Sequence, residues 1–377
     1  MKFSTILSAV AMLAQQSVAH PGQSQAEAQK EIQQRQDYLS ANKRTLVDCA
    51  DQLKARGNDA MLQARRSAKL ESLRRKRSIS IDKPLLKARS LEQVLNTSHR
   101  SNLTGINPET ADPATLFTGN ASCTLYPETT EGPYWVSGEF IRDNITEDQP
   151  GIPFIVDIQV IDVHTCEAVP QVYTELWHAN TTGVYSGISS YGNGDSTDTS
   201  NLNRTALRGL WPTDKDGVVT FESIFPGHYY GRAPHIHVIT HLNAKVNDNN
   251  TLSGGNITHV GQFFFDQSLI TETGKTTPYN TNTQELTLNE DDGILVEESA
   301  IIDPIVEYVY LGEDISEGLF GWISFGIDTS ASQNVTAAAW LTPDGGVANP
   351  EGGPRFTPSS SGSSSLPTAS ASALVSA

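Results

Sequence analysis

The middle and later parts of the chain contain a series of short segments rich in β-branched and aromatic residues. They occupy residues 154–163, 171–179, 218–224, 235–242, 259–266 and 320–328. Turn-forming stretches such as 213–217 lie between them, and no helical periodicity intervenes. Short strands in this arrangement predict a mainly β fold, with the strands packed as an antiparallel β-sandwich.

Residues 20–90 have a different character from the rest of the chain. Between Gly22 and Arg89 there are sixteen Lys and Arg against eight Asp and Glu, although the whole chain carries a net charge of −17. Helix-forming residues predominate, and apolar side chains recur every seven residues, at Ile32, Leu39, Leu46 and Leu53. We therefore expect an N-terminal α-helical arm, interrupted near Gly57.

Two properties of this arm are left open by the sequence. Its heptad phase fits a homodimer formed through the arm, and it fits equally well an arm that packs on its own sandwich. The run Arg74–Arg77 fits a processing site or an anion-binding patch. We favour a plainer interpretation, a helix face that meets solvent and the acidic body. The acidic remainder of the chain argues against a nucleic-acid partner.

The first residues predict export. Residues 1–19 combine Lys2, a short apolar run and a small-residue site, which is the pattern of a signal peptide, and no segment is long enough to span a membrane. Nine Asn-x-Ser/Thr sites then favour a secreted glycoprotein; they are Asn96, Asn102, Asn120, Asn144, Asn180, Asn203, Asn249, Asn256 and Asn334. Cys49, Cys123 and Cys166 allow one disulfide in any of three pairings.

These observations divide the chain into five parts. We expect a signal peptide at 1–19, the basic helical arm at 20–90, a linker rich in Asn, Ser and Thr at 91–115, and the sandwich at 116–345. The Ser-rich composition of 346–377 predicts a disordered tail.

The stretch 226–237, PGHYYGRAPHIH, contains several residues that can bind a metal ion or carry a charge. His235 and His237 are two residues apart, so on a strand both side chains leave the same face and can reach one metal ion. With Tyr185 and Tyr229 they would supply two imidazole nitrogens and two phenolate oxygens. A set of ligands without thiolates or carboxylates suits ferric iron better than zinc. The alternative is that the tyrosines bind no metal, since a tyrosine on a strand is more commonly a half-buried structural residue.

Three segments together resemble the intradiol ring-cleavage dioxygenases, which include the catechol, protocatechuate and hydroxyquinol dioxygenases, and especially their secreted fungal branch. The segments are 127–135 (PETTEGPYW), 175–186 (ELWHANTTGVYS) and 213–237, followed by GQFFFD at 261–266. The resemblance extends over residues 115–330 or so and excludes the arm and the tail.

The resemblance implies a non-haem Fe(III) held by Tyr185, Tyr229, His235 and His237, with Tyr185 as the ligand that dissociates. It also implies that Arg232 stabilises charge on the bound substrate and that Gln262 lies near Arg232 and the reacting ring. Tyr134 would line the substrate mouth. Tyr230 directly follows Tyr229, so either residue could be the second tyrosine ligand, and we favour Tyr229. We expect His178 and His228 to be structural hydrogen-bonding residues.

The expected activity is oxidative cleavage of a catechol-type ring by O2, between the two hydroxyl-bearing carbons, to a cis,cis-muconate-type product. The alternative is an inactive β-sandwich module that binds aromatics or glycans, which would have no need for four ligands and Arg232 together. A zinc hydrolase is disfavoured because no carboxylate accompanies the histidines in the sequence.

Overall fold

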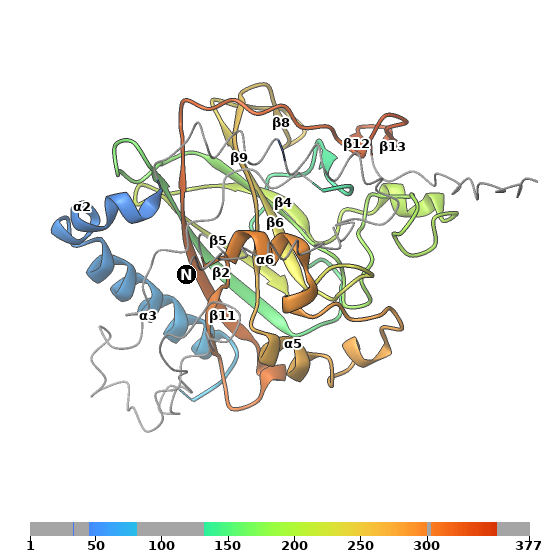
Figure 1. Ribbon diagram of the computed structural model, residues 1–377, viewed down its shortest axis with the longest axis horizontal. Coiled ribbons are helices and arrows are strands. Elements are labelled where there is room, and N and C mark those ends of the chain that lie inside the picture. Colours follow the sequence, from blue (N-terminus) through green and yellow to red (C-terminus); the bar gives the residue numbers. More distant parts are fainter. Residues whose placement is uncertain (1–32, 34–44, 81–131, 300–302, 353–377) are drawn as a thin grey trace, which may run out of the picture.

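The computed structural model describes Gln33 and residues 45–80, 132–299 and 303–352. Two four-stranded sheets dominate it (Figure 1). The sheet that we call the scaffold sheet has the order β10 (Glu307–Tyr310), β11 (Leu319–Ile327), β2 (Pro153–Asp162) and β5 (Val218–Ile224). The second, the site sheet, has the order β4 (Arg208–Pro212), β3 (Tyr173–Trp177), β6 (His235–Leu242) and β9 (Asn256–Phe264). The mainly β sandwich and all six predicted strands are confirmed.

The strand pairing departs from the antiparallel prediction at the centre of the scaffold sheet. β2 and β11 run parallel, with Phe154 opposite Leu319 and Ile155 opposite Phe320, whereas the other pairs in both large sheets are antiparallel. More than 150 residues separate the two strands in the sequence. Long crossovers of this kind permit a parallel pair that a hairpin does not allow.

The main core lies between the two sheets. On β2 the residues Phe154, Val156, Ile158 and Val160 all belong to this core, together with Ile236 and Val238 of β6 and Phe263 of β9. Because successive strand side chains alternate between faces, the residues between them point outward. The outer face of the scaffold sheet therefore presents Ile155, and that of the site sheet presents His235 and His237.

The helical arm covers the outer face of the scaffold sheet. It consists of η1 (Leu46–Cys49), α2 (Ala50–Ala55) and α3 (Asn58–Lys76), and in Figure 1 its two blue helices lie beside β2 and β11. Leu70 and Leu73 of α3 pack with Ile155, Phe320 and Trp322. The predicted helix interruption falls at Gly57, which has a φ of 72°. The leucine contacts show that the described part of the arm packs on its own sandwich.

A disulfide between Cys49 and Cys166 fixes this arm to the sandwich. It selects one of the three pairings that the sequence allows and leaves Cys123, which lies outside the described residues. Ile32 and Leu39 of the heptad pattern also lie outside them. The homodimer through the arm therefore stays a prediction.

The basic run Arg74–Arg77 lies at the end of α3 and contacts the body. Arg74 is buried, and its Nε donates to the carbonyl oxygen of Leu311 at 2.7 Å. Lys76 forms an ion pair with Glu222 at 3.3 Å. These contacts agree with the interpretation of a helix face that meets solvent and the acidic body.

Smaller elements complete the described structure. β1 (Val136–Ser137), β12 (Ala339–Thr342) and β13 (Gly345–Ala348) form a three-stranded sheet, and β7 (Lys245–Val246) pairs with β8 (Leu252–Ser253). Two short helices, α5 (Gln267–Thr273) and α6 (Gly293–Ser299), follow β9. The short 3-10 helices are η3 (Thr199–Asn203), η4 (Tyr279–Thr281), η5 (Asn289–Asp291) and η6 (Ile315–Glu317).

The predicted ends of the chain lie mostly outside the described residues. This holds for the signal peptide at 1–19, the linker at 91–115 and most of the tail at 346–377, although β13 ends inside the range predicted as tail. Among the described residues, no helix combines the length and apolar character needed to cross a membrane.

Candidate metal centre

β6 brings the two predicted histidines to one place. His235 and His237 are both buried, and their Nε2 atoms lie 3.1 Å apart. The Nδ1 of His235 lies 2.7 Å from the carbonyl oxygen of Ala233. A carbonyl only accepts, so Nδ1 carries the proton and the Nε2 lone pair is directed toward His237. Fixing the second ring nitrogen in this way is how proteins orient a metal-binding imidazole.

The His237 ring is closely surrounded. It stacks on Trp177 of β3, its cross-strand neighbour, with ring centroids 4.6 Å apart and planes 4° apart. Gly132 also approaches the ring, and a Cβ atom there would come within 2.8 Å of His237 Cε1. Gly132 also has a φ of 70°, so both its backbone conformation and its close approach to His237 require glycine.

Two tyrosines complete the cluster. The hydroxyl of Tyr185 lies 3.4 Å and that of Tyr229 lies 3.5 Å from His235 Nε2. Tyr185 lies on the loop after β3, and Tyr229 lies in the turn before β6. We call Tyr185, Tyr229, His235 and His237 the donor cluster.

Tyr229 and Tyr230 are clearly distinguished by burial. Tyr229 is 2% exposed and contributes to the donor cluster, whereas Tyr230 is 63% exposed. The backbone nitrogen of Tyr230 donates to Gln284 Oε1 at 3.1 Å. Of these two tyrosines, Tyr229 is therefore the one whose hydroxyl lies in the donor cluster.

The donor cluster fits a bound ferric ion. Ligands about 2.0–2.1 Å from one ion, at angles of about 90–120°, are separated from each other by about 2.9–3.6 Å. The distances from His235 Nε2 to the other three donor atoms are 3.1–3.5 Å. Burial raises the pKa of Tyr185 and of Tyr229, so a strong positive charge is needed to ionise these phenols. Two phenolic oxygens and two imidazoles are a set that hard, highly charged cations accept.

Arg232 is buried beside the cluster and is fixed by two partners. Its Nη2 donates to Gln262 Oε1 at 2.6 Å, and its Nε donates to Asp292 Oδ2 at 2.9 Å. Gln262 faces His237 across the β6–β9 ladder. The carboxylate of Asp292 raises the pKa of Arg232 even though burial opposes this, so the guanidinium stays charged.

Asp292 was not predicted from the sequence. Its Oδ2 also accepts from the backbone nitrogen of Ala233 at 2.8 Å, and its Oδ1 accepts from those of Ile294 and Leu295 at 3.0 Å at the start of α6. An acidic residue before an apolar run is a helix-start signal. Nothing in that local signal indicates a contact with an arginine sixty residues earlier.

Tyr134, predicted to line the substrate mouth, packs against both tyrosines of the donor cluster. Its ring centroid lies 4.8 Å from that of Tyr185 and 5.8 Å from that of Tyr229. Its hydroxyl donates to the carbonyl oxygen of Tyr191 at 3.5 Å.

The other histidines of the two motifs make structural hydrogen bonds. His178 lies between Ala179 O, at 2.8 Å, and Ser223 Oγ, at 2.7 Å, and burial lowers its pKa to about 4. His228 Nε2 lies 2.9 Å from Gln284 O. These contacts agree with the hydrogen-bonding roles predicted for both.

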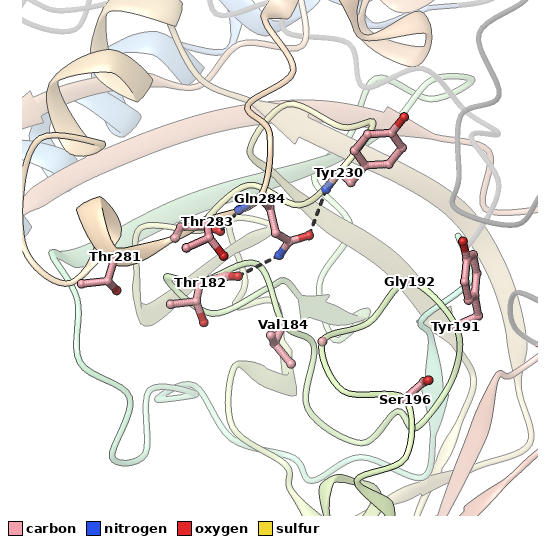
Figure 2. A pocket seen from close by; sticks show the side chains of 11 residues that line it. Thr182, Val184, Tyr191, Gly192, Ser196, Tyr230, Thr281, Thr283 and Gln284 are labelled. Atoms are coloured by element: carbon pink, nitrogen blue, oxygen red, sulfur yellow. Dashed lines mark hydrogen bonds between the residues drawn. The ribbon is translucent and has the colours of Figure 1, made fainter.

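Gln284 joins the two loops that carry the tyrosines of the donor cluster (Figure 2). Its Nε2 donates to Thr182 O at 2.8 Å, and its Oε1 accepts from the Tyr230 nitrogen. Beside it runs an open groove of about 590 Å³. The groove is lined by Val184 and Tyr230, which are sequence neighbours of Tyr185 and Tyr229, and by Tyr191, with no charged side chain in its described lining.

Comparison with known proteins gives matches of two kinds. A family model described as "Dioxygenase" matches residues 130–250. An intradiol ring-cleavage dioxygenase from Tetranychus urticae is 33% identical over 56% of this chain and 98% of its own, with a TM-score of 0.45. No curated protein sequence matches.

Two more distant structures are also similar. The dioxygenase domain of a dioxygenase carbohydrate-binding protein fusion from Streptomyces sp. SirexAA-E is 25% identical, over 54% of this chain and 98% of its own, with a TM-score of 0.33. Catechol 1,2-dioxygenase from Pseudomonas arvilla C-1 is 18% identical, over 58% of this chain and 67% of its own, with a TM-score of 0.32. The basis for a family assignment is the 33% identity across nearly the whole mite enzyme, together with the family-model match.

Proposed function

The chain belongs to the intradiol ring-cleavage dioxygenases, and on that premise we propose that it is a secreted Fe(III) enzyme acting on catechol-type rings. It cleaves the bond between the two hydroxyl-bearing carbons with O2 and gives a cis,cis-muconate-type product. The observation that carries this proposal is the donor cluster, in which three buried donor atoms lie within 3.5 Å of a fourth, His235 Nε2.

Tyr185, Tyr229, His235 and His237 would hold the iron. When bound, the Fe(III) would supply Lewis-acid chemistry that increases the acidity of the catechol hydroxyls. The protein contributes a site closed to solvent, because the four side chains are each at most 2% exposed. Exclusion of water strengthens every charge interaction there.

Tyr185 is the residue predicted to accept a proton from the substrate, and Tyr229 is buried beside it. Both tyrosines lie outside the strands, whereas His235 and His237 lie within β6 and are fixed by the strand ladder. Burial raises the pKa of both hydroxyls, so either phenolate would take up a proton readily inside this site. The proton would then reside on the Oη atom of that tyrosine.

Arg232 supplies a fixed positive charge at the same site. Asp292 and Gln262 bind two of its nitrogens, and Nη1 has no hydrogen-bond partner among the described residues. A buried guanidinium that is already oriented stabilises negative charge developing on the ring without having to reorganise. Tyr134, packed on Tyr185, would line the path of the ring into the site.

The chemical test is oxygen consumption by the iron-loaded full chain. Catechol, hydroxyquinol, protocatechuate and alkyl catechols would be supplied in parallel, and the products identified by their ultraviolet spectra and masses. We expect one O2 consumed per ring and a mass gain of both oxygen atoms. An iron-loaded protein that consumes no oxygen with any of these catechols would contradict the proposal.

The groove beside Gln284 favours a second candidate, a binding module for aromatic or sugar rings without turnover. Tyr191 and Tyr230, 45% and 63% exposed, flank a lining of hydroxyl and amide side chains, which suits neutral ring-shaped ligands. A protein that binds catechols or oligosaccharides in calorimetry but contains no iron and consumes no oxygen would support this candidate over the enzyme.

Secretion and glycosylation belong to the same proposal. Among the described sites, the side chains of Asn144, Asn203, Asn249, Asn256 and Asn334 are exposed. Asn180 is different, because its Oδ1 accepts from Thr182 and Val184 and shapes the loop that carries Tyr185. Expression of the full chain in a eukaryotic host should place it in the medium with glycans at the exposed sites; a cell-retained, unglycosylated protein would contradict this part.

A further inference from the structure

Gln284 contributes no atom to the donor cluster, yet it bonds to both loops that carry the cluster's tyrosines. It lies in the segment 279–292, between α5 and α6, which we call the brace. Its Nε2 donates to the carbonyl oxygen of Thr182 at 2.8 Å and to that of Gly183 at 3.3 Å. Its Oε1 accepts from the backbone nitrogen of Tyr230 at 3.1 Å (Figure 2). One side chain therefore connects the two loops.

The orientation of this amide follows from its partners. A carbonyl oxygen only accepts and a backbone N–H only donates, so the amide nitrogen must face Thr182 and Gly183 and the amide oxygen must face Tyr230. Both N–H groups and one lone pair of Gln284 are thereby engaged. Although Gln284 lines the groove, these bonds leave little of its amide for a ligand.

The brace also holds the residue before Tyr229. Asn282 Nδ2 donates to the carbonyl oxygen of His228 at 2.8 Å. His228 Nε2 lies 2.9 Å from the carbonyl oxygen of Gln284, and because a carbonyl only accepts, Nε2 is the donor. With the bond to Tyr230 added, the peptide groups on both sides of Tyr229 are bonded to the brace.

The brace is itself anchored at both ends. At its start, Tyr279 is 5% exposed, and its hydroxyl donates to the carbonyl oxygen of Phe225 at 2.7 Å. At its end, Asp292 accepts from Arg232 Nε at 2.9 Å. Functional side chains are held precisely by residues that are themselves locked by packing and hydrogen bonds. The brace therefore offers Gln284 a fixed place beside the two loops.

The two loops also meet directly, but their own contact is not a strong tie. The backbone nitrogen of Gly227 donates to the carbonyl oxygen of Asn180 at 3.2 Å, at the long end of the normal range. At Gly183, which has a φ of 79°, a Cβ atom would collide with the carbonyl oxygen of His228. Such close packing limits how near the loops can come, whereas the hydrogen bonds of Gln284 limit how far they can separate.

We propose that Gln284 is a positioning residue, which sets the separation of the two loops and so the placement of the Tyr185 and Tyr229 phenols around His235 Nε2. Their oxygens lie 3.4 and 3.5 Å from that nitrogen. This placement is a property of the chain alone. Its effect on catalysis rests on the proposed function, in which both phenols bind iron.

Two variants of Gln284 and one control separate positioning from general support. Gln284→Met keeps the length of the side chain and removes its hydrogen bonds, whereas Gln284→Glu keeps the acceptor for Tyr230 and removes the donor to Thr182. Gln267→Met is the matched control. It makes the same change to an amide that also bonds to the brace, through Asn289 N at 2.8 Å, but to neither tyrosine loop in the described structure.

Four properties of the iron-loaded full chain are measured: thermal unfolding, iron content, the visible charge-transfer band between tyrosinate and Fe(III), and kcat with KM. For both Gln284 variants we expect a folded protein that binds iron, a shifted band, and kcat lowered about tenfold with KM changed less than about threefold, since small misplacements of reacting groups are costly. We expect Gln267→Met to keep the wild-type band and kcat. A folded Gln284→Met with wild-type band and kcat would overturn the proposal, and so would an equal shift in Gln267→Met.

Two further measurements keep the test decisive. If Gln284→Met does not fold, Gln284→Glu takes its place, and wild-type band and kcat there would overturn the proposal. Metal-free full chain with isotope-labelled tyrosine rings gives a readout that does not depend on iron, with the resonances assigned through Tyr185→Phe and Tyr229→Phe.

In the metal-free protein we expect the Tyr185 and Tyr229 resonances to shift in Gln284→Met and to stay in place in Gln267→Met. Unchanged resonances in Gln284→Met would overturn the proposal. A wild type that binds no iron and consumes no oxygen, but whose tyrosine resonances shift in Gln284→Met, would contradict the proposed function and support the positioning role.

Discussion

The two sheets of the sandwich share one core but differ in what covers their outer faces. The scaffold sheet is covered by α3, whose Leu70 and Leu73 pack on Phe320 and Trp322. The site sheet is covered by loops that bring Tyr134, Tyr185 and Tyr229 over Trp177 and the two histidines. One outer face is thus closed by an apolar helix contact, the other by aromatic side chains whose polar atoms converge.

The polar groups on the two faces are satisfied differently. On the scaffold sheet, Gln159 exchanges two hydrogen bonds with Asn58 of α3, at 2.9 and 3.2 Å, and Arg65 forms ion pairs with Asp157 and Asp214. On the site sheet, two imidazoles and two phenols face one another without a carboxylate between them. The difference teaches that a buried polar cluster indicates a ligand when its members are all electron-pair donors.

The largest expected effect is on activity, and it comes from removing a donor side chain from the outer face of the site sheet. His235→Ala removes one of the four proposed ligands, and we expect iron content to fall to near zero and kcat to fall by about a thousandfold or more, since the metal would supply the main activation. Iron analysis and oxygen uptake measure this. His164→Ala is the matched control, because His164 is half-exposed and pairs with Asp328 far from the cluster. Retained iron and activity in His235→Ala would contradict the assignment.

Breaking the scaffold face should affect stability without affecting chemistry. Replacing Cys49 and Cys166 by serine removes the covalent bond between arm and sandwich, and we expect the free energy of unfolding to fall by about 2–5 kcal/mol. Denaturant titration measures this change. We expect kcat of the folded variant to stay within about twofold, and a loss of the visible spectrum would show that the two faces are coupled.

A single apolar truncation in the arm should have a somewhat smaller effect. Leu73→Ala leaves a cavity against Phe320 and Trp322, and we expect a loss of about 2–4 kcal/mol in the free energy of unfolding. Val47→Ala serves as the control, because Val47 is 59% exposed and should change stability by less than about 0.5 kcal/mol. Equal effects of the two variants would contradict the described packing of α3.

In the core between the two sheets, one buried histidine should make the free energy of unfolding depend on pH. His259 of β9 is buried against Phe325 of β11, and burial lowers its pKa to about 3. The unfolded chain, with an ordinary histidine pKa of about 6.5, therefore binds more protons as the pH falls from 6.5 toward 3, and the folded state loses stability over that range. At pH 5 this cost is about 2 kcal/mol. Comparing His259→Leu with the wild type at pH 7.5 and pH 5 should show a smaller loss in the variant; equal losses would contradict a buried neutral His259.

The smallest expected effect is on the exposed edge of the arm. Lys76 is 67% exposed and pairs with Glu222 at 3.3 Å. Lys76→Ala should lower the free energy of unfolding by less than about 1 kcal/mol, because solvent screens such pairs. A loss as large as that of Leu73→Ala would show that charge, rather than apolar contact, holds the arm.

Much of the fold was predictable because it is encoded locally. Period-two patterns and turn residues identified six of the eight strands in the two large sheets, and helix-forming residues identified the arm. β4 was missed because Gly209 and Pro212 interrupt its pattern, and β10 is only four residues long. The parallel β2–β11 pair and the Cys49–Cys166 pairing depend on the packing of distant segments, which no local pattern specifies.

The site was predictable to a similar degree. The two-residue spacing of His235 and His237 placed both on one face of a strand, and the dioxygenase resemblance added the tyrosines, Arg232 and Gln262. Asp292 was not foreseen. Its partner Arg232 lies sixty residues earlier in the sequence, and the local helix-start pattern to which Asp292 belongs says nothing about the site.

The visible absorption spectrum of the iron-loaded protein tests the central claim most directly, namely that Tyr229 and Tyr185 bind iron together with His235 and His237. Tyrosinate-to-Fe(III) charge transfer should make the wild type red-brown, and Tyr229→Phe should bleach or shift the band. The neighbouring Tyr230→Phe, which alters an exposed ring, should leave the band unchanged. A colourless iron-loaded protein, or a band that responds to Tyr230→Phe and not to Tyr229→Phe, would contradict the account.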